Sequence, residues 1–348
     1  MHHLELAHLS KSFGGTRAVH DLNLQVDRGE ILSILGPSGC GKTTTLRMIA
    51  GLETPSSGAI LSNGRDITNF PARARNMGMV FQNYALFPHL DVFENVAFGL
   101  KTRRVAGSVI EKRVQKALIA VRMEAYDRRS VHQLSGGQQQ RIALARALAI
   151  EPEILLLDEP LSNLDPSLRE DLRDQIRNII RELAVTTVFV THDQQEAFAL
   201  ADRVAIMDAG ICRQIGKPDE VYNRPADTFV AGFLGKANLL PGSLLGLGNS
   251  VIAMVRPENV VISFLGGESI SPKPDRSAPI LGGAGGGKTF PAIIKRTVFE
   301  GPIITYALDI NGVSLTARQF HHGQHSCKPG DSVQVSIPCD RLHVLGRS

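Results

Sequence analysis

The N-terminal part of the chain alternates short apolar runs with segments whose apolar residues recur at helical spacing. The runs are Ile31–Leu35, Met77–Phe81, Ile154–Leu157, Val188–Thr191 and Arg203–Met207. A continuous apolar run is typical of a strand that is buried on both faces of a parallel sheet. Gln194–Ala201 has helical periodicity, and the alternation extends from about Leu4 to about Tyr222. The pattern predicts an α/β domain.

A helical pattern from Val109 to about Gln140 interrupts this alternation, and we expect a helical subdomain at about residues 90–150. Within it, Leu134–Gln138 reads Leu-Ser-Gly-Gly-Gln. The glycines leave backbone amides free to approach a phosphate closely, and the serine adds a hydroxyl donor. Ser and Gly are also common at helix ends, so an ordinary capping turn is the alternative interpretation.

A glycine-rich loop follows the first apolar run. Residues 36–43 read Gly-Pro-Ser-Gly-Cys-Gly-Lys-Thr, and Thr44–Ala50 continue as a helical segment. Between a strand and a helix, the backbone amides of such a loop cradle a β-phosphate. Lys42 then reaches the β- and γ-phosphates, and the Thr43 hydroxyl binds Mg²⁺. The sequence therefore predicts an ATP site at Gly36, Pro37, Ser38, Gly39, Cys40, Gly41, Lys42, Thr43 and Thr44.

The same glycine-lysine pattern recurs at residues 282–289, with Lys288 in the lysine position. Pro279 interrupts the approach, so no strand of adequate length precedes this loop. Pro291 follows where a helix would have to continue. We therefore interpret this second match as a glycine-rich loop that binds no nucleotide.

Two adjacent carboxylates follow the apolar run Ile154–Leu157. Successive side chains of a strand point in opposite directions. Asp158 can therefore hold Mg²⁺, directly or through water, while Glu159 polarises the water that attacks the γ-phosphate. Two solvated surface acids are the alternative, but they would leave the phosphate loop without its usual acidic partner.

Together these motifs resemble those of the nucleotide-binding subunit of an ATP-binding-cassette (ABC) transporter. The resemblance covers nearly the whole chain, including Thr191–Gln194 and Phe229–Gly235. It implies that adenine stacks on Phe13, that Gln82 senses Mg²⁺ and a transmembrane partner, and that His192 contacts the γ-phosphate and orients the attacking water. A buried core position is the alternative for Phe13.

The resemblance also implies that each ATP site is completed by a second copy of the chain. One copy would supply the catalytic residues Lys42, Gln82, Glu159 and His192, and the Mg²⁺ ligands Thr43, Gln82 and Asp158. The opposing copy would supply Ser135, Gly136, Gly137 and Gln138. Residues 162–165 would communicate between the two sites. We expect a homodimer that closes on ATP and opens after hydrolysis.

From Asn238 the pattern changes to short β-type runs that Gly, Pro and Ser separate. These runs predict a small all-β barrel, with residues 266–288 as its long loop. The runs are Val251–Val255, Val260–Ser263, Ala292–Val298, Ile303–Ile310 and Val333–Ile337.

Val255–Glu258 and Glu300–Pro302 resemble motifs of the OB-type barrel appended to importer ATPases, in which the barrel serves dimerisation and regulation. We therefore predict a P-loop ATPase domain at residues 1–235 and a barrel domain at residues 236–348. Phe229–Leu234 would form a short linking helix.

Composition limits the partners and the compartment. The net charge of +4 would permit nucleic-acid binding, but no Lys/Arg run and no basic stripe with interleaved aromatics is present, so we expect no nucleic-acid partner. The four cysteines show no Cys-x-x-Cys spacing, which suggests a reducing compartment. Nearby amides could favour a thiolate at Cys40, but a small packed thiol is the interpretation that we prefer.

No apolar run approaches the roughly 20 residues that span a bilayer, and the start lacks the apolar segment of a signal peptide. We expect a peripheral subunit at the cytoplasmic face of the inner membrane, working with two transmembrane permease subunits and, indirectly, an extracytoplasmic solute-binding protein. A permease helix would dock in the groove from Asn83 through Leu90 toward Phe98. Packing within the domain is the alternative for these apolar residues.

These expectations combine into the energy-coupling ATPase of an ABC importer, which converts ATP and water to ADP and phosphate. Ferric iron or a polyamine is the expected solute, with a sugar or a phosphonate as the alternative. A soluble, non-transport ABC ATPase is a candidate of a different class, but such proteins usually carry long coiled-coil insertions or two cassettes in one chain. A phosphotransferase would leave residues 134–138 without a role.

Overall fold

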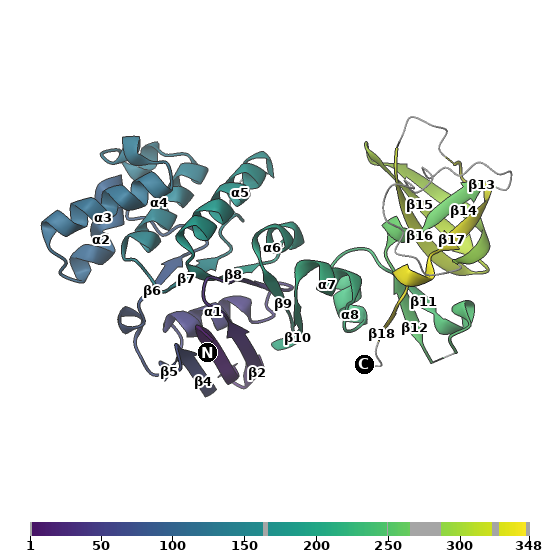
Figure 1. Cartoon of the computed structure of the whole chain (residues 1–348), viewed down its shortest axis with the longest axis horizontal. Coiled ribbons are helices and arrows are strands. Elements are labelled where there is room, and N and C mark those ends of the chain that lie inside the picture. The colour runs from purple at the N-terminus through teal and green to yellow at the C-terminus, as the bar shows by residue number, and fades with distance from the viewer. Residues whose placement is uncertain (1, 163–165, 249, 265–286, 322–326, 346–348) are drawn as a thin grey trace. The chain divides into compact units, whose positions relative to one another are not determined.

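The computed structural model describes residues 2–162, 166–248, 250–264, 287–321 and 327–345. The chain divides into two compact units, Met1–Pro218 and Asp219–Ser348 (Figure 1). The boundary that we expect from the sequence, between residues 235 and 236, follows the change of composition, whereas the packing of the chain divides it at Pro218.

A six-stranded sheet of order β10-β9-β3-β8-β7-β6 forms the centre of the first unit. All neighbouring pairs are parallel except β9 and β10. The buried strands coincide with the apolar runs, because a strand covered on both faces has no polar side to alternate with. The strands are β3 (Ile31–Leu35), β6 (Met77–Val80), β7 (Ile154–Asp158), β8 (Thr186–Thr191), β9 (Arg203–Asp208) and β10 (Ile211–Gly216).

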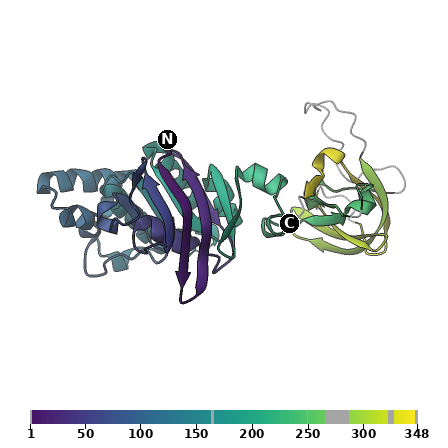
Figure 2. The ribbon, with the colours of Figure 1, turned by 90° about the horizontal axis from the view of Figure 1, so that it is seen from below.

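A four-stranded antiparallel sheet of order β2-β1-β4-β5 lies beside this layer, and Figure 2 shows its long strands side by side. The two sheets share one core with α1 (Lys42–Ala50), in which Leu6, Leu46 and Val188 are fully or almost fully buried. The antiparallel strands are β1 (Leu4–Phe13), β2 (Thr16–Val26), β4 (Ser57–Ser62) and β5 (Arg65–Asp66). The remaining helices of the α/β layer are α5 (Pro166–Leu183) and α6 (Gln194–Leu200).

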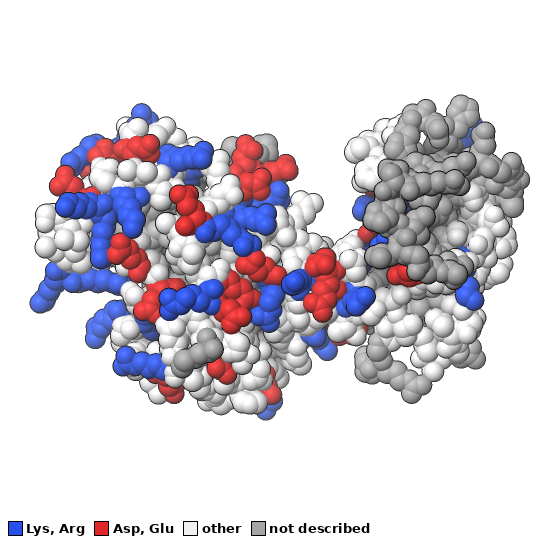
Figure 3. Space-filling model, viewed as in Figure 1, with Lys and Arg blue, Asp and Glu red and all other residues white. Residues whose placement is uncertain are grey.

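A group of three helices forms the helical subdomain, and Figure 1 shows them packed together at one end of the first unit. They are α2 (Val92–Thr102), α3 (Gly107–Ala120) and α4 (Gly136–Ala149). Ile110, Val114 and Leu144 are buried in this group. Over the first unit, the face seen in Figure 3 carries basic and acidic side chains interspersed with one another.

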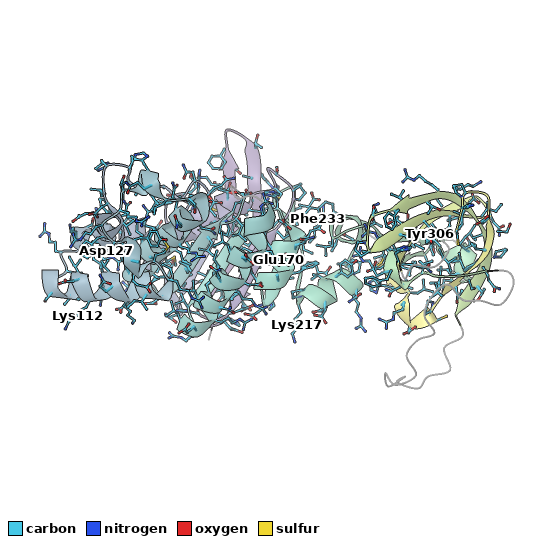
Figure 4. The ribbon with its side chains drawn as sticks, turned by 90° about the horizontal axis from the view of Figure 1, so that it is seen from above. Lys112, Asp127, Glu170, Lys217, Phe233 and Tyr306 are labelled. Atoms are coloured by element: carbon cyan, nitrogen blue, oxygen red, sulfur yellow. The ribbon has the colours of Figure 1, made fainter. Side chains whose placement is uncertain are left out.

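The second unit is an antiparallel β structure preceded by two short helices, α7 (Pro218–Asn223) and α8 (Thr228–Phe233). A five-stranded sheet of order β13-β17-β14-β15-β16 curls around a core of its own, as an OB-type barrel does. Tyr306 points into this core (Figure 4) and is almost fully buried. The strands are β13 (Val261–Phe264), β14 (Lys288–Phe299), β15 (Ile303–Ile310), β16 (Val313–Phe320) and β17 (Ser332–Ile337). A three-stranded sheet contains β11 (Asn238–Pro241), β12 (Ile252–Val255) and β18 (His343–Leu345).

Arg256 explains why the two short helices pack with the barrel. Its side chain is 1% exposed, donates to the carbonyl oxygen of Tyr222 at 2.7 and 3.0 Å, and donates to that of Ala231 at 2.9 Å. The guanidinium also lies 4.0 Å from the centroid of the Tyr222 ring. One buried cation therefore ties both α7 and α8 to the end of β12, and this is the structural role of the Val255–Glu258 motif.

The second glycine-lysine match leads into a strand. Lys288 opens β14 opposite Ile337, and Pro291 lies within that strand opposite Gln334. Pairing of β14 with β15 begins only at Ile293, so the stretch that contains the proline is paired on one side and tolerates a missing N–H. Residues 282–286 of the match lie outside the described residues.

Candidate functional site

The loop between β3 and α1 closes around the amine of Lys42. This side chain is almost completely buried, and its Nζ donates to the carbonyl oxygens of Gly36 and Pro37, each at 2.8 Å. A Cβ at Gly36 would lie 2.3 Å from the Met207 carbonyl oxygen, so only glycine fits there. Gly41 precedes the helix with φ of 101°, and no side chain caps it. The first amides of α1 thus remain available to an anion.

Cys40 lies inside the same loop and is buried. Burial raises the pKa of its thiol, although the ammonium of Lys42, 3.8 Å from the sulfur, acts in the opposite direction. The thiol is therefore a small packed group and not a thiolate stabilised by the loop.

Asp158 and Glu159 face different groups, as we expected, but Glu159 lies beyond the end of β7, so its left-handed backbone and not strand alternation directs its side chain. The Thr43 hydroxyl lies 3.3 Å from Asp158 Oδ1, and burial raises the pKa of this carboxyl group. The Glu159 carboxylate accepts from Gln82 Nε2 at 2.9 Å and lies 3.3 Å from His192 Nδ1. Glu159 has a φ of 45°, a left-handed conformation that residues other than glycine adopt mainly where the surroundings enforce it.

The parallel register explains how residues far apart in sequence meet here. Leu35 pairs with Thr191, and Asp158 pairs with Val190, so the loops after β3, β7 and β8 leave the same edge of the sheet. Ligands of open α/β sheets bind at this carboxyl edge. The structure thus brings together Lys42, Thr43, Gln82, Asp158, Glu159 and His192.

Glu196 supports the histidine and was not identified from the sequence. It is buried in α6 and accepts from the Thr191 hydroxyl at 2.6 Å. The same hydroxyl accepts from the amide of Asp193 at 3.0 Å, which fixes the backbone on both sides of His192. Burial raises the pKa of Glu196. Its only sequence signal is its place in the first turn of a helix capped by Asp193.

The stretch that contains Ser135 caps the N-terminus of α4. Gln138 N donates to Ser135 Oγ at 3.4 Å, and Ser135 N donates to Gln138 Oε1 at 3.0 Å, so a capping box is formed. The capping interpretation is thus correct in geometry, but it does not exclude binding, because a capped helix still presents its first amides. Within the described part of this chain, no hydrogen bond or ion pair joins residues 135–138 to residues 36–44.

Phe13 ends β1 next to a turn in which Gly14 and Gly15 both have positive φ. Its side chain is 46% exposed, so the buried-core alternative is wrong. Lys11 Nζ lies 4.7 Å from the ring centroid, but its charge is paired with Glu53, so the exposed group at this edge is the aromatic ring.

No helix within the described residues is long and apolar enough to cross a membrane. In the described part of the chain, the side chains of His, Cys, Asp and Glu form no group of three or more suited to a metal ion. Any metal at this site would therefore depend on hydroxyl, amide, phosphate or water oxygens in addition to Asp158.

Comparisons with known proteins identify the family of this chain. A family model described as "ABC transporter" matches residues 19–162, and a "TOBE domain" model matches residues 253–345. The spermidine/putrescine import ATP-binding protein PotA of Acetivibrio thermocellus is 37% identical, over 98% of this chain and 96% of the relative. The Fe(3+) ions import ATP-binding protein FbpC 1 of Pectobacterium atrosepticum is 41% identical, over 98% of this chain and 96% of the relative.

Solved structures match the first unit. A dimeric bacterial ABC transporter cassette, MJ0796, has a TM-score of 0.56 at 32% identity, covering 62% of this chain and 98% of the cassette. A post-hydrolysis dimer of the same cassette bound to ADP and phosphate gives a TM-score of 0.55 at 33% identity, with the same coverage.

Proposed function

This chain belongs to the family of ABC transporter ATP-binding proteins, and on that premise we propose that it hydrolyses ATP to energise an importer. The contact of one carboxylate, Glu159, with both Gln82 and His192 carries the proposal. A carboxylate within hydrogen-bond reach of a histidine, beside a phosphate loop, is the arrangement that activates and orients water. Two solvated surface acids would have no reason to meet these partners.

The phosphate loop binds the triphosphate in this proposal. Lys42 exchanges the carbonyl oxygens of Gly36 and Pro37 for β- and γ-phosphate oxygens, since a buried ammonium requires acceptors in either state. The free amides at the start of α1 bind the β-phosphate. The adenine ring stacks on the exposed face of Phe13.

Magnesium fits the oxygen-rich side of this site. Mg²⁺ prefers a few protein oxygens together with phosphate and water, and the pair formed by Thr43 and Asp158 supplies such oxygens at close separation. Thr43 and Asp158, with Gln82, would hold the ion, which when bound would neutralise charge on the β- and γ-phosphates. Burial of Asp158 favours binding of a cation, since a nearby positive charge offsets the desolvation of the carboxylate.

A second copy of the chain completes the site. Ser135, Gly136, Gly137 and Gln138 present the N-terminus of a 14-residue helix, and in one copy they make no polar contact with the described phosphate loop. We propose that they bind the γ-phosphate of the ATP held by the partner copy, so that ATP closes a homodimer. The dimeric cassettes among the similar structures support this arrangement.

In this proposal the membrane partners are two transmembrane permease subunits, which this chain binds at the cytoplasmic face of the inner membrane, and an extracytoplasmic solute-binding protein is an indirect partner. The expected docking groove is partly buried: Val96 and Ala97 belong to the core, as the packing alternative predicts, whereas Phe98 is exposed and lies 4.3 Å from Phe87, centroid to centroid. We propose that the Phe87–Phe98 pair forms the floor on which a permease helix docks.

The solute of this transporter is ferric iron or a polyamine in our proposal. The names of the two full-length relatives support both, and a sugar or phosphonate is the alternative. The barrel matched by the TOBE model would carry regulation and dimer contacts.

Co-expression with a candidate permease pair from the same genome tests the proposal. The purified complex should contain two copies of this chain and two hydrophobic subunits, and loaded binding protein should stimulate its ATPase activity. A chain that purifies without membrane subunits, and whose ATPase activity responds to DNA or ribosomes instead, would contradict the proposal in favour of a non-transport ABC ATPase.

A further inference from the structure

The segment between β6 and α2 has an unusual backbone. Within this Gln82 loop, which we define as residues 82–90, Tyr84 has a φ of 62° and Ala85 a φ of 48°. Two consecutive residues other than glycine in the left-handed region cost free energy, and such strain persists only where neighbouring groups hold it. The first residue of this loop, Gln82, donates a hydrogen bond to Glu159, so the loop is in direct contact with the catalytic carboxylate.

Arg146 of α4 holds this strained turn. Its Nη1 donates to the Ala85 carbonyl oxygen at 2.6 Å, and its Nη2 donates to that of Tyr84 at 2.8 Å. The guanidinium also lies 5.6 Å from the centroid of the Phe87 ring. The planar fork of an arginine suits two neighbouring acceptors, whereas the point charge of a lysine does not.

The other end of the loop is attached to α2. Asn95 is fully buried, accepts from Phe87 N at 2.8 Å, and points its amide at the carbonyl oxygens of Phe87 and Leu90, each at 3.1 Å. The Gln82 loop is therefore clamped between two helices of the helical subdomain, with Arg146 at its strained end and Asn95 at the end that leads into α2.

Ser135 caps the N-terminus of the same helix α4, eleven residues before Arg146. At 1.5 Å per residue the two positions lie about 16 Å apart along one continuous helix. On the proposed function, the Ser135 end meets the ATP of the partner copy, while the Arg146 end grips the loop that contacts the catalytic carboxylate and the permease groove.

We propose that Arg146 is a positioning residue that transmits the closure of the ATP dimer from α4 to the Gln82 loop. When the partner's ATP engages the Ser135 end, α4 moves as a rigid element, and the bidentate contact obliges Tyr84 and Ala85 to move with it. Gln82 and the Phe87–Phe98 floor then change position together, so hydrolysis and permease movement remain in step. A loop attached only through the backbone would relax its strain instead of following the helix.

The test compares two substitutions at Arg146 with a matched control in the same subdomain. Arg146→Met keeps an unbranched side chain and removes both hydrogen bonds, and Arg146→Lys restores the charge without the fork. Arg128→Met is the control, because the Arg128 guanidinium lies 5.4 Å from the Phe93 centroid, outside the Gln82 loop. All are assayed in the complete complex with its permeases, for ATPase activity and for the spermidine or ferric iron, whichever wild type imports, that is transported per ATP hydrolysed.

We expect Arg146→Met to lower permease-stimulated ATPase activity about tenfold and the solute-to-ATP ratio severalfold, with the KM for ATP within about twofold of wild type. The ATPase activity and the solute-to-ATP ratio of Arg146→Lys should lie between those of Arg146→Met and wild type, and Arg128→Met should match wild type in both. A correctly assembled Arg146→Met complex with an unchanged solute-to-ATP ratio would overturn the inference. If Arg146→Met does not assemble, an unchanged ratio in the Arg146→Lys complex would overturn it equally.

A second readout needs no permease. In a Glu159→Gln background, ATP should slow hydrogen exchange of the amides from Tyr84 to His89, and the added Arg146→Met substitution should abolish that protection. Equal protection in both proteins would count against transmission through Arg146. The inference rests on the proposed function, and the wild-type complex separates failure of one from failure of the other. If the permeases do not stimulate the wild-type ATPase, the proposed function and the inference are both wrong. If they do stimulate it and the Arg146 variants transport as much solute per ATP as wild type, only the inference is wrong.

Discussion

Residues 36–43 and residues 282–289 carry the same glycine-lysine pattern, yet the chain uses them differently. The first follows a strand buried on both faces and opens a helix whose amides lack a side-chain cap. The second runs into β14, where Lys288 pairs across a ladder with Ile337 and is exposed. What separates them is the surrounding structure: the buried Asp158, Glu159 and His192 lie at the same edge of the sheet as the first loop, and a phosphate site requires such partners.

Loss of the Glu159 carboxylate should produce the largest effect. Glu159→Gln should retain ATP binding and lower turnover by about 10²–10⁴-fold, because the amide keeps the shape of the side chain but cannot accept a proton from water. ATP should then hold the dimer closed. Steady-state ATPase assays and size-exclusion chromatography of the assembled complex check this. Near-normal turnover would exclude Glu159 as the principal base.

Replacing each of the two lysines tests the comparison itself. Lys42→Ala should lower hydrolysis about 100-fold or more, since the charge on the β- and γ-phosphates loses its partner. Lys288→Ala should leave ATP affinity and turnover unchanged. Nucleotide titration and ATPase assays on both variants give the answer, and equal losses would show that the second match also binds nucleotide.

Two exposed phenylalanines extend the comparison to aromatic groups. Phe13→Ala should weaken ATP binding by about 5- to 100-fold, in line with the loss of one base-stacking contact. Phe320→Ala in β16 is the control, because its ring is 72% exposed but belongs to the barrel. Isothermal titration with ATP measures both. If wild type and Phe13→Ala bind ATP with the same affinity, adenine does not stack on Phe13.

A smaller effect concerns the buried Glu196 behind His192. Burial raises its pKa above the ordinary value of 4.5. Between pH 4.5 and the raised pKa, the carboxyl group therefore keeps its proton in the native state but has lost it in the unfolded chain. Stability should therefore fall as pH rises from about 4.5 through the raised native pKa, and the loss should be complete above it. Below about pH 4.5 both states are protonated and the group contributes nothing.

Glu196→Gln keeps an acceptor for the Thr191 hydroxyl and removes the charge. Its stability advantage over wild type should be smallest near pH 4, should grow as the pH rises above about 4.5, and should stay constant once the pH exceeds the raised native pKa of Glu196. Urea unfolding across this range measures the difference. A constant difference at every pH would show that the carboxyl group does not titrate between the two states.

The sequence alone was sufficient to predict the strands and loops that carry the catalytic residues. The apolar runs match β3 and β15 at both ends and β7 within one residue, because periodicity and turn residues act locally along the chain. The P-loop class, the helical subdomain and the curled C-terminal sheet were also correctly predicted. The predicted runs did not include β16 (Val313–Phe320), although its residues 313–318 alternate apolar and polar and its Leu315 and Ala317 are buried. Strand β14 begins at Lys288, four residues before the predicted run, because β17 supplies its partners.

The tertiary structure alone decided which side chains support those that do the chemistry. Arg146 is 61 residues from Ala85 and Arg256 is 34 from Tyr222, while Glu196 reaches the Thr191 hydroxyl across the turn between β8 and α6. Each makes hydrogen bonds to backbone or hydroxyl groups whose identity a sequence pattern does not record. The motif residues are constrained locally, by glycine geometry and strand alternation, and can be read from the chain. Their supports are constrained by distance in space, and only the folded chain specifies them.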